Sequence, residues 1–507
     1  MKQFHSKSKI VRSLNFLFLI IPLLTFSQVQ IGEDILGEGF ADFSGSCVSI
    51  SGDGTMVAIG APFNYGSSIY AGQVRVYENK NNEWIQVGSD IDGKDFHEHL
   101  GSYVSLSNDG SVVAISAPDS DKNGTDSGNV SIYKNINDEW TQVGNDILGK
   151  NRYELLGTSL SISNDGSIVA IGAPESHVIE HSPGLVRVYK YIGNNWIQIG
   201  SDIYGEDDND ESGLSVSLSG EGNIVAIGAP HNAEVNNASQ ILNIGHVRVF
   251  KNINDEWIQL GDDIDGEEYG QFGYSVSLSN DGNILAIGGI YNDGITINDG
   301  QNEGHVRVYK YFNNSWIQVG DDIDGEDAED KSGWSVSLSN DGSIVAIGAP
   351  DNDGNGDGSG HVRVYQNLSN HWSQIGSDIN GVNSNDEAGF STSISSDGTI
   401  LAVGSRFYGE GGFSQGHVRV YDLTTVLSAE SFKHNFFSYY PNPVKNELNI
   451  NLITGLKLKQ INIYNIQSQY LYSVRTSKID VTNLSSGMYF LEVETNQGKS
   501  AKKILIE

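Results

Sequence analysis

The feature that most constrains this chain is an internal repeat. A run similar to Ser-Val-Ser-Leu-Ser-Asn-Asp-Gly occurs seven times, and its turn glycine lies at Gly54, Gly110, Gly166, Gly222, Gly282, Gly342 and Gly398. Successive glycines are 56 residues apart, apart from two intervals of 60. A fixed period of this length indicates one structural unit repeated along the chain, with neighbouring units packed against each other.

Each unit contains four strand-like runs, which predicts one antiparallel sheet per unit. In the first run of unit six, Val336 and Leu338 alternate with small serines, which suits a crowded innermost strand. The second run is apolar throughout, as expected for a strand covered on both faces. An Asn-Asp-Gly turn joins these two runs and tolerates the positive φ of a tight hairpin. The runs in this unit are Trp334–Ser339, Ser343–Ala349, His361–Tyr365 and Trp372–Ile375.

Seven such sheets could form a closed propeller or an open stack, and the chain ends distinguish the two. The seventh unit stops at Tyr421 without its fourth run. The missing run stands instead near the N-terminus, where 29–37 matches 141–149 of unit two. The sequence therefore predicts an all-β fold, a seven-bladed β-propeller closed by the N-terminal strand, which leaves only short edges.

Several residue types recur at one position of the repeat, and we interpret them as packing residues. Recurrence places such side chains equivalently in every unit, and four histidines on four units would not converge on one metal. These residues are Trp84, Trp140, Trp196, Trp257, Trp316 and Trp372, the arginines Arg75, Arg187, Arg307, Arg363 and Arg419, and the histidines His246, His305, His361 and His417.

The chain ends indicate export. Residues 1–27 combine four basic residues with the apolar run 16–24, which fits a secretory signal peptide cleaved before Gln28. No other run is apolar for the roughly 20 residues that a spanning helix needs, so we expect no transmembrane anchor. Cys47 is the only cysteine, which excludes an internal disulfide, and we assign it no role.

The charge is uneven along the chain. Of the net charge of −34, residues 1–27 and 431–507 contribute +4 each, which leaves −42 for residues 28–430. A body this acidic repels phosphate backbones and anionic lipids, so we expect no nucleic-acid partner. Solvated acidic loops account for the same charge unless ligand geometry shows otherwise.

The runs Phe272–Val276, Ala346–Pro350 and Gly360–Tyr365 resemble the FG-GAP repeats of integrin α-subunit propellers and their bacterial relatives. The resemblance covers about residues 28–424. It implies seven blades, with ligands engaged through the loops that join strand two to three and strand four to the next blade. Integrin-type repeats bind calcium in an Asp-rich loop between their first two strands. This chain has only Ser-Asn-Asp-Gly there, so we expect those calcium sites to be absent.

Carboxylates concentrate in the loops between strands two and three, most densely at 351–358. Alternating Asp and Asn oxygens around a glycine turn can wrap a hard cation, with carbonyls and water completing the shell. This predicts a calcium site, although Asn/Asp/Gly clusters are also ordinary turn material. Asp119–Asn123 is a poorer copy, because Lys122 brings a competing charge. The candidate calcium ligands are Asp351, Asp353, Asn355 and Asp357.

Two loops exceed the period. The segments 231–244 and 291–303 have 14 and 13 residues, against nine in the other units. Insertions on one face of a repeat array often mark its binding side, and neutral loop growth would give the same pattern. Both loops lack a basic cluster and an aromatic ladder for sugar stacking.

After a linker at 425–437, residues 438–507 change to a lysine-bearing, aliphatic composition. Four alternating runs predict a small immunoglobulin-like β-sandwich. Tyr440–Leu448, Leu484–Phe490 and Lys502–Ile506 are similar to the C-terminal sorting domain (type A) of the bacterial type IX secretion system. That resemblance implies the type IX machinery as a partner, and release into the medium or attachment to the cell surface. An ordinary immunoglobulin-like appendage would lack these spaced motifs.

Two functions remain open at this stage. The first is an exported surface or secreted protein that binds a surface protein or glycan through one rim of the propeller. The second is a secreted, glycosidase-like hydrolase that uses acidic residues of the channel, since two carboxylates suffice for glycoside cleavage. No nucleophile elbow, His-Glu-x-x-His motif or phosphate-binding glycine loop is present, and carboxylates that recur in every unit are not specific catalytic residues. The sequence favours binding and names neither a catalytic residue nor the ligand.

Overall fold

A computed structural model describes most of the chain after the predicted signal peptide, which itself lies outside the described residues. The regular secondary structure within this range is almost entirely β-strand. The description covers 28–507 without 176–181, 236–240, 268, 293–301, 410–413, 428–436, 453–455, 466–469 and 496–497.

The body of the chain consists of antiparallel sheets of one repeated design, consistent with a propeller. Four strands follow one another across each sheet, and a fifth strand of two residues pairs with the third. Sheets 1 to 3 are β3 (Cys47–Ile50), β4 (Met56–Ala61), β5 (Gln73–Lys80), β6 (Glu83–Gln86) and β7 (Ile91–Asp92); β8 (Val104–Leu106), β9 (Val112–Ala117), β10 (Asn129–Ile136), β11 (Glu139–Gln142) and β12 (Ile147–Leu148); and β13 (Ser159–Ile162), β14 (Ile168–Ala173), β15 (Leu185–Ile192), β16 (Asn195–Gln198) and β17 (Ile203–Tyr204).

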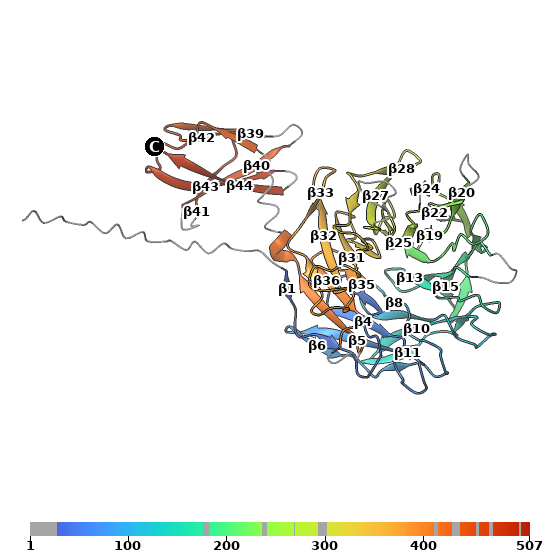
Figure 1. The fold of residues 1–507 in the computed structure, drawn as a ribbon. Helices are drawn as coiled ribbons and strands as arrows, with labels where there is room; N and C mark the ends of the chain where they lie inside the picture. Colours follow the sequence, from blue (N-terminus) through green and yellow to red (C-terminus); the bar gives the residue numbers. More distant parts are fainter. Residues whose placement is uncertain are drawn as a thin grey trace, which may run out of the picture.

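Sheets 4 to 6 repeat this order, and a small hairpin extends the loop of sheet 4. Figure 1 shows the sheets around a common centre in sequence order. Their strands are β18 (Ser215–Leu218), β19 (Ile224–Ala229), β22 (His246–Ile253), β23 (Glu256–Gln259) and β24 (Ile264–Asp265), with the hairpin β20 (Ala233–Val235) and β21 (Ile241–Asn243); β25 (Phe272–Leu278), β26 (Ile284–Gly289), β27 (His305–Phe312), β28 (Ser315–Gln318) and β29 (Ile323–Asp324); and β30 (Ser335–Leu338), β31 (Ile344–Ala349), β32 (His361–Asn367), β33 (Trp372–Gln374) and β34 (Ile379–Asn380).

Sheet 7 combines the two ends of the repeat region. Its strands β35 (Ala388–Ile394), β36 (Ile400–Ser405) and β37 (His417–Asp422) are followed across the sheet by β1 (Val29–Gln30). The short β2 (Ile35–Leu36) also pairs with β37. In register, Gln30 lies opposite Tyr421 and Ile35 opposite Val418. The N-terminal segment thus takes the place of the fourth and fifth strands of this sheet.

The strand pattern follows from the sequence as predicted, with one addition. Every residue of β31 is buried, as expected for an apolar strand covered on both faces. The addition is a short strand after the fourth run of each unit, which is β34 in sheet 6, beyond the predicted run Trp372–Ile375. Gly376 lies between β33 and β34 with a φ of +71°, a backbone conformation that glycine adopts readily.

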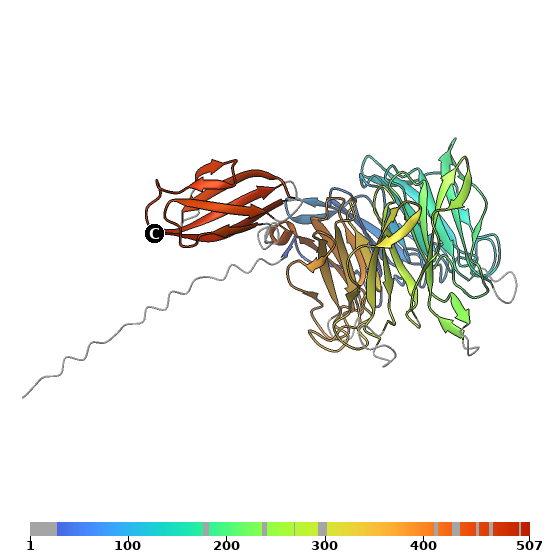
Figure 2. The same cartoon turned by 90° about the horizontal axis from the view of Figure 1, so that it is seen from above.

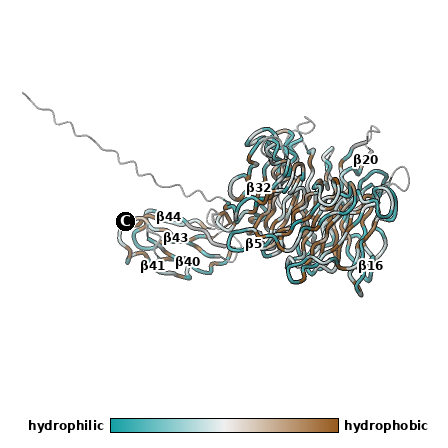
Figure 3. The backbone as a smooth tube through the Cα atoms, turned by 90° about the horizontal axis from the view of Figure 1, so that it is seen from below, coloured by the Kyte–Doolittle hydropathy of each residue, from teal (hydrophilic) through white to brown (hydrophobic). Residues whose placement is uncertain are grey.

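Neighbouring sheets are joined through their first strands. The amide of Leu106 donates to Ser49 Oγ at 2.9 Å, and the same bond joins Ile394 to Ser337 at 3.0 Å. Ile50 of sheet 1 donates to Ser393 Oγ of sheet 7 at 3.0 Å. The small alternating serines predicted for a crowded inner strand therefore accept hydrogen bonds from the next sheet. Figure 3 shows that the strands carry the hydrophobic residues and the loops the hydrophilic ones.

The C-terminal region forms two sheets that share one core, visible as the red unit in Figure 2. Ile450 of one sheet and Ile463 and Leu491 of the other are buried in the same cluster. The prediction of a small sandwich agrees with this arrangement. One sheet contains β38 (Phe437–Tyr440), β39 (Glu447–Leu452) and β42 (Lys478–Asp480), and the other β41 (Tyr470–Val474), β40 (Leu458–Asn465), β43 (Gly487–Thr495) and β44 (Gly498–Ile506).

The segment after sheet 7 is partly packed. Leu423 and Val426 are buried in the cluster that contains Ile375 and Ile379 of sheet 6. Val426 lies in the predicted linker 425–437, so the start of this segment packs against the body of the repeat region. Among the described residues, no helix has the length and apolar character needed to cross a membrane.

Candidate functional site: the central cavity and the loop end

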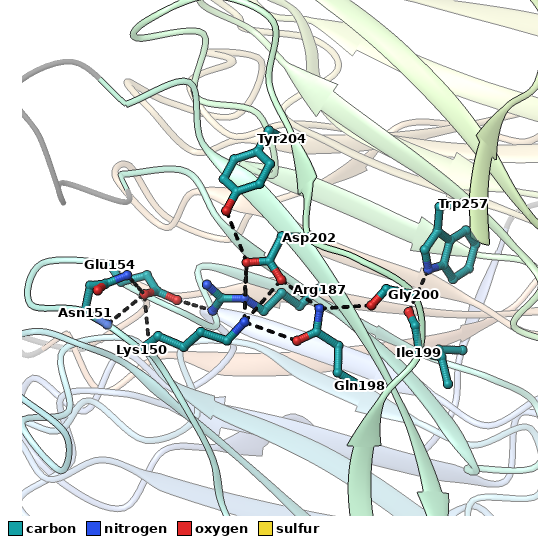
Figure 4. A network of polar contacts seen from close by, with 10 residues as sticks. All are labelled: Lys150, Asn151, Glu154, Arg187, Gln198, Ile199, Gly200, Asp202, Tyr204 and Trp257. Atoms are coloured by element: carbon teal, nitrogen blue, oxygen red, sulfur yellow. Dashed lines mark hydrogen bonds and ion pairs between the residues drawn. The ribbon is translucent and has the colours of Figure 1, made fainter. Parts of the chain in front are cut away.

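The recurring arginines tie the short fifth strands to the third strands. Arg187 in β15 donates from Nε to Asp202 Oδ2 at 2.9 Å and pairs with the fully buried Glu154 (Figure 4). Burial acts to raise the pKa of Asp202, but hydrogen bonds from Gln198 and Arg187 outweigh it and lower this pKa. The same ion pair joins Arg307 to Asp322, Arg363 to Asp378 and Arg419 to Asp34. These contacts support the interpretation of the arginines as structural residues.

The recurring tryptophans join neighbouring sheets. Trp257 Nε1 donates to the carbonyl of Ile199 in the preceding sheet at 2.9 Å (Figure 4). Trp84 of sheet 1 donates in the same way to Ile31 of the N-terminal segment at 2.9 Å. Gln28 stands where sheet 7 would carry its tryptophan, and its side chain donates to the carbonyl of Ser377. The tryptophans therefore serve packing, as predicted.

The four recurring histidines are buried on four different sheets. Burial, together with a neighbouring arginine, lowers the pKa of His305, His361 and His417 to about 4, so these side chains are neutral at neutral pH. His361 lies near Glu326 and Asp378, a spacing that could hold a metal ion. Arg363 already pairs with both carboxylates, however, and its charge opposes a dication there.

The predicted calcium ligands each have partners within the protein. Asp351 Oδ2 lies 2.6 Å from Lys331 Nζ, and Asp353 Oδ1 accepts from the amide of Gly358 at 2.8 Å. Asn355 Nδ2 donates to the carbonyl of Gly381 at 2.7 Å. The carbonyl of Asp357 accepts from the amide of Asn385 at 2.7 Å. Calcium binding by this loop stays a prediction.

The corresponding loop of sheet 2 has the same internal hydrogen bonds. Asp121 Oδ1 accepts from the amide of Asp126 at 2.9 Å, and Asn123 Nδ2 donates to Gly149 at 2.7 Å. Lys122 Nζ lies 3.0 Å from Glu98 and 3.1 Å from Asp146. The competing charge predicted for Lys122 is thus already paired with two carboxylates.

A cavity of about 390 Å³ lies where the first strands of all seven sheets meet. Its lining contains one serine from each sheet, a group of aromatic side chains and Arg406, and no carboxylate is among the described residues that form it. The hydrolase alternative required acidic residues in this channel, and the lining offers it no carboxylate pair. Cys47 also lines the cavity, and burial raises the pKa of its thiol to about 11, so it is not a ready nucleophile.

One side of this cavity is an aromatic wall. The rings of Tyr274 and Trp334 have centroids 4.8 Å apart, and those of Trp334 and Phe390 are 5.3 Å apart. The guanidinium carbon of Arg406 lies 3.6 Å from the centroid of Phe390. Sheets 5, 6 and 7 thus carry aromatic residues at a repeat position where sheets 1 to 4 carry Ser46, Ser102, Thr158 and Leu214.

None of the predictions from the sequence identified this wall. The signal was present, because Phe-Gly-Tyr-Ser, Ser-Gly-Trp-Ser and Ala-Gly-Phe-Ser stand at one position of three consecutive units. Aromatic residues that depart from the repeat are therefore a signal in the sequence that recurrence alone does not show.

A second aromatic group lies at the loop end of the sheets, the end that carries the loops between strands two and three and the connections to the next sheet. Phe63 lines the cavity and contacts Phe43 at 5.0 Å and His99 at 4.7 Å between ring centroids. Phe43 also contacts Phe407 at 5.0 Å. We call the following residues the aromatic rim: Phe43, Phe63, Tyr65, Tyr70, Phe96, His97, His99 and Phe407.

The two long loops connect strands two and three of sheets 4 and 5, so they leave the sheets at this same loop end. The first contains the hairpin of β20 and β21. His231 Nδ1 at its start lies 2.9 Å from Glu211 Oε1, and the hydrogen bond that the histidine donates to this carboxylate raises the histidine's pKa. Most of the second loop lies outside the described residues.

Comparison with family models matches two parts of the chain. Residues 438–507 match the model of the secretion system C-terminal sorting domain, and residues 323–365 match the FG-GAP repeat. A search of curated proteins returned no match. Both predicted resemblances are confirmed. The sorting domain implies interaction with the type IX secretion machinery and a secreted or cell-surface location.

Proposed function

We propose that this chain is an exported binding protein, which engages a surface protein or glycan through the loop end of a closed seven-bladed propeller. Its sorting domain provides the route of export. The observation that carries the proposal is the position of the aromatic side chains that do not recur in every unit. They form one surface, which extends from the aromatic wall of the cavity to the aromatic rim.

The continuity of this aromatic surface supports binding. Phe390 of the wall contacts Arg406, whose guanidinium carbon lies 4.6 Å from the centroid of Phe407 in the rim. At the outer part of the rim, Phe96 is 63% exposed and Tyr65 48% exposed. Exposed aromatic side chains beside a cavity provide large contact area at low cost in conformational entropy, which suits recognition of a partner.

The proposal includes closure of the ring, which several contacts support. Contacts between first strands run from β3 through β8, β13, β18, β25, β30 and β35 and back to β3. A second series of bonds between backbone groups has the same order, and it includes Ser396 N to Gly52 O at 2.8 Å. Pairing of β1 and β2 with β37 would then close sheet 7. A closed ring leaves the loop end as a continuous circular surface.

The test is binding of the full exported chain, residues 28–507, to immobilised glycans and cell-surface proteins. The variant Tyr70→Ser/Phe96→Ser removes two rim rings, and we expect its affinity to fall about tenfold or more. The control is Ile317→Ser, which removes an exposed apolar side chain from the outer strand β28. Equal loss in both variants, or the absence of any saturable partner, would contradict the proposal.

A further inference from the structure

The residues that line the central cavity restrict the class of ligand that could bind there more than the residues of the rim do. All seven serines of the lining donate their hydroxyl protons to backbone carbonyls. Ser46 donates to Phe43 at 2.7 Å and Ser102 to His99 at 2.8 Å, within their own loops. The other five, Ser159, Ser215, Ser275, Ser335 and Ser391, donate to a glycine of the next sheet.

This hydrogen-bonding state favours a ligand that supplies its own donors. A serine whose proton is committed still offers lone pairs as an acceptor. The seven serines therefore present hydroxyl oxygens as acceptors, whereas the donors of the lining are on Tyr103, Tyr274, Trp334 and Arg406. Phosphates, sulfates and carboxylates need donors, so the serines suit them poorly.

The charges at the cavity disfavour both cations and anions, each for its own reason. No carboxylate is among the described lining residues, so a cation lacks a counter-charge. Arg406 occupies one face of Phe390, which opposes a cation on the aromatic wall. Its charge is not free for an anion either, because Nε lies 2.7 Å from Glu387 Oε2. A neutral ligand fits these constraints.

The aromatic wall provides the apolar contact. Tyr274, Trp334 and Phe390 come from three consecutive sheets and have interplanar angles of 47° and 44°, so the wall bends around the cavity. On sheets 1 and 2 the equivalent residues are the small Ser46 and Ser102, and these sheets contribute Phe63 and Tyr103 to the lining at other positions. A ligand here would rest one apolar face on the rings and direct polar groups to the serines.

We propose that the central cavity binds a neutral carbohydrate, with C–H groups of a sugar ring against Trp334 and sugar hydroxyls donating to the lining serines. A pyranose combines an apolar face with several O–H donors and no charge. The volume of about 390 Å³ lies at the lower end of small-molecule sites, roughly 300–1,000 Å³, and suits one or two sugar units. The inference rests on the proposed binding function and assigns its ligand class.

The matched variant is Trp334→Ser. It gives sheet 6 the residue that sheets 1 and 2 already carry at this position, so the repeat itself shows that serine is compatible with the fold. Ile317→Ser on the outer strand is the control. Thermal melting of both variants would verify that each is folded.

The experiment titrates residues 28–507 with glucose, galactose, mannose, N-acetylglucosamine and their disaccharides, followed by tryptophan fluorescence and calorimetry. Glucuronate and glucosamine serve as the charged counterparts. We expect saturable binding of at least one neutral sugar, little binding of its charged counterpart, and a loss of about tenfold or more in Trp334→Ser only.

Two outcomes would overturn the inference while leaving the proposed function intact. One is binding of surface partners that depends on Tyr70 and Phe96 but is insensitive to every sugar and to Trp334→Ser. The other is preference for the charged counterparts. Sugar binding that Trp334→Ser abolishes, in a chain whose rim variant retains all surface binding, would instead support the cavity and contradict the role of the rim.

Discussion

A buried histidine begins the third strand in sheets 4 to 7. Those of sheets 5, 6 and 7 have a pKa of about 4, because burial and a neighbouring arginine both disfavour the charged form. Below the ordinary histidine pKa of about 6.5, these three side chains are protonated in the unfolded chain. In the folded chain they stay neutral until the pH approaches 4. The contribution of these histidines to the free energy of unfolding is therefore complete above about pH 6.5, and it decreases as the pH drops toward 4.

We expect His305→Gln to reduce this loss of stability in acid. Glutamine is the residue that sheet 1 carries at the same position, where Gln73 is buried. Each histidine should account for a few kcal/mol of unfolding free energy between pH 6.5 and 4. Denaturant titrations at several pH values would measure it. The exposed His371→Gln is the control, and identical pH slopes in wild type and His305→Gln would contradict the expectation.

The N-terminal strands are the element on which sheet 7 depends. Deletion of residues 29–36 would remove their pairing with β37, the 2.7 Å contact of Arg419 with Asp34 and the bond from Trp84 to Ile31. We expect the free energy of unfolding to fall by about 4 kcal/mol or more. Hydrogen exchange should show the largest loss of protection in β36 and β37.

The variant Asp34→Asn distinguishes the contribution of the ion pair to stability from that of the strand pairing. It retains the backbone pairing of β1 and β2 and removes only the charged partner of Arg419. A charge-assisted hydrogen bond contributes roughly 1.5–3 kcal/mol, so its effect should be smaller than that of the deletion. Unchanged melting after the deletion would refute the dependence of sheet 7 on this segment.

The loop at 351–358 is a second element that allows a direct test. If it binds calcium, saturating calcium should stabilise the full chain against chelator, by about 2.7 kcal/mol at one hundred times the dissociation constant. Asp353→Asn/Asp357→Asn should abolish this shift. Asp121→Asn is the matched control, because Lys122 already neutralises charge in the loop of sheet 2. If the melting temperature does not change with calcium, the acidic residues of 351–358 are solvated turn residues and not calcium ligands.

At the scale of the whole molecule, the C-terminal sandwich and the propeller have separate roles. Residues 438–507 have their own core, and the match to the sorting domain covers this same range. Deletion of 438–507 should leave a folded, protease-resistant propeller in the periplasm, whereas the full chain reaches the surface or the medium. Cell fractionation with immunodetection would measure the distribution. Surface delivery of the truncated chain would show that export does not depend on the tail.

The four main strands of each repeat could be predicted from the sequence. Period-two alternation, a fully apolar second run and an Asn-Asp-Gly turn are local properties of the chain, so they identify each strand without tertiary contacts. The match between 29–37 and 141–149 also predicted the pairing of the N-terminal segment with sheet 7. The motifs of the tail sufficed to identify the sorting domain.

The contacts between residues of different sheets could not be predicted from the sequence. Tyr274, Trp334 and Phe390 are about 60 residues apart in sequence, and they form one wall because packed sheets place equivalent positions side by side. Five of the seven lining serines donate to a glycine of the next sheet, so no local pattern shows that their protons are committed. Arg406 and Glu387 pair within sheet 7, where the pairing of β35 with β36 brings their positions together. Residues that recur in every unit identify the scaffold from the sequence, whereas the side chains that depart from the repeat come together only when the chain folds.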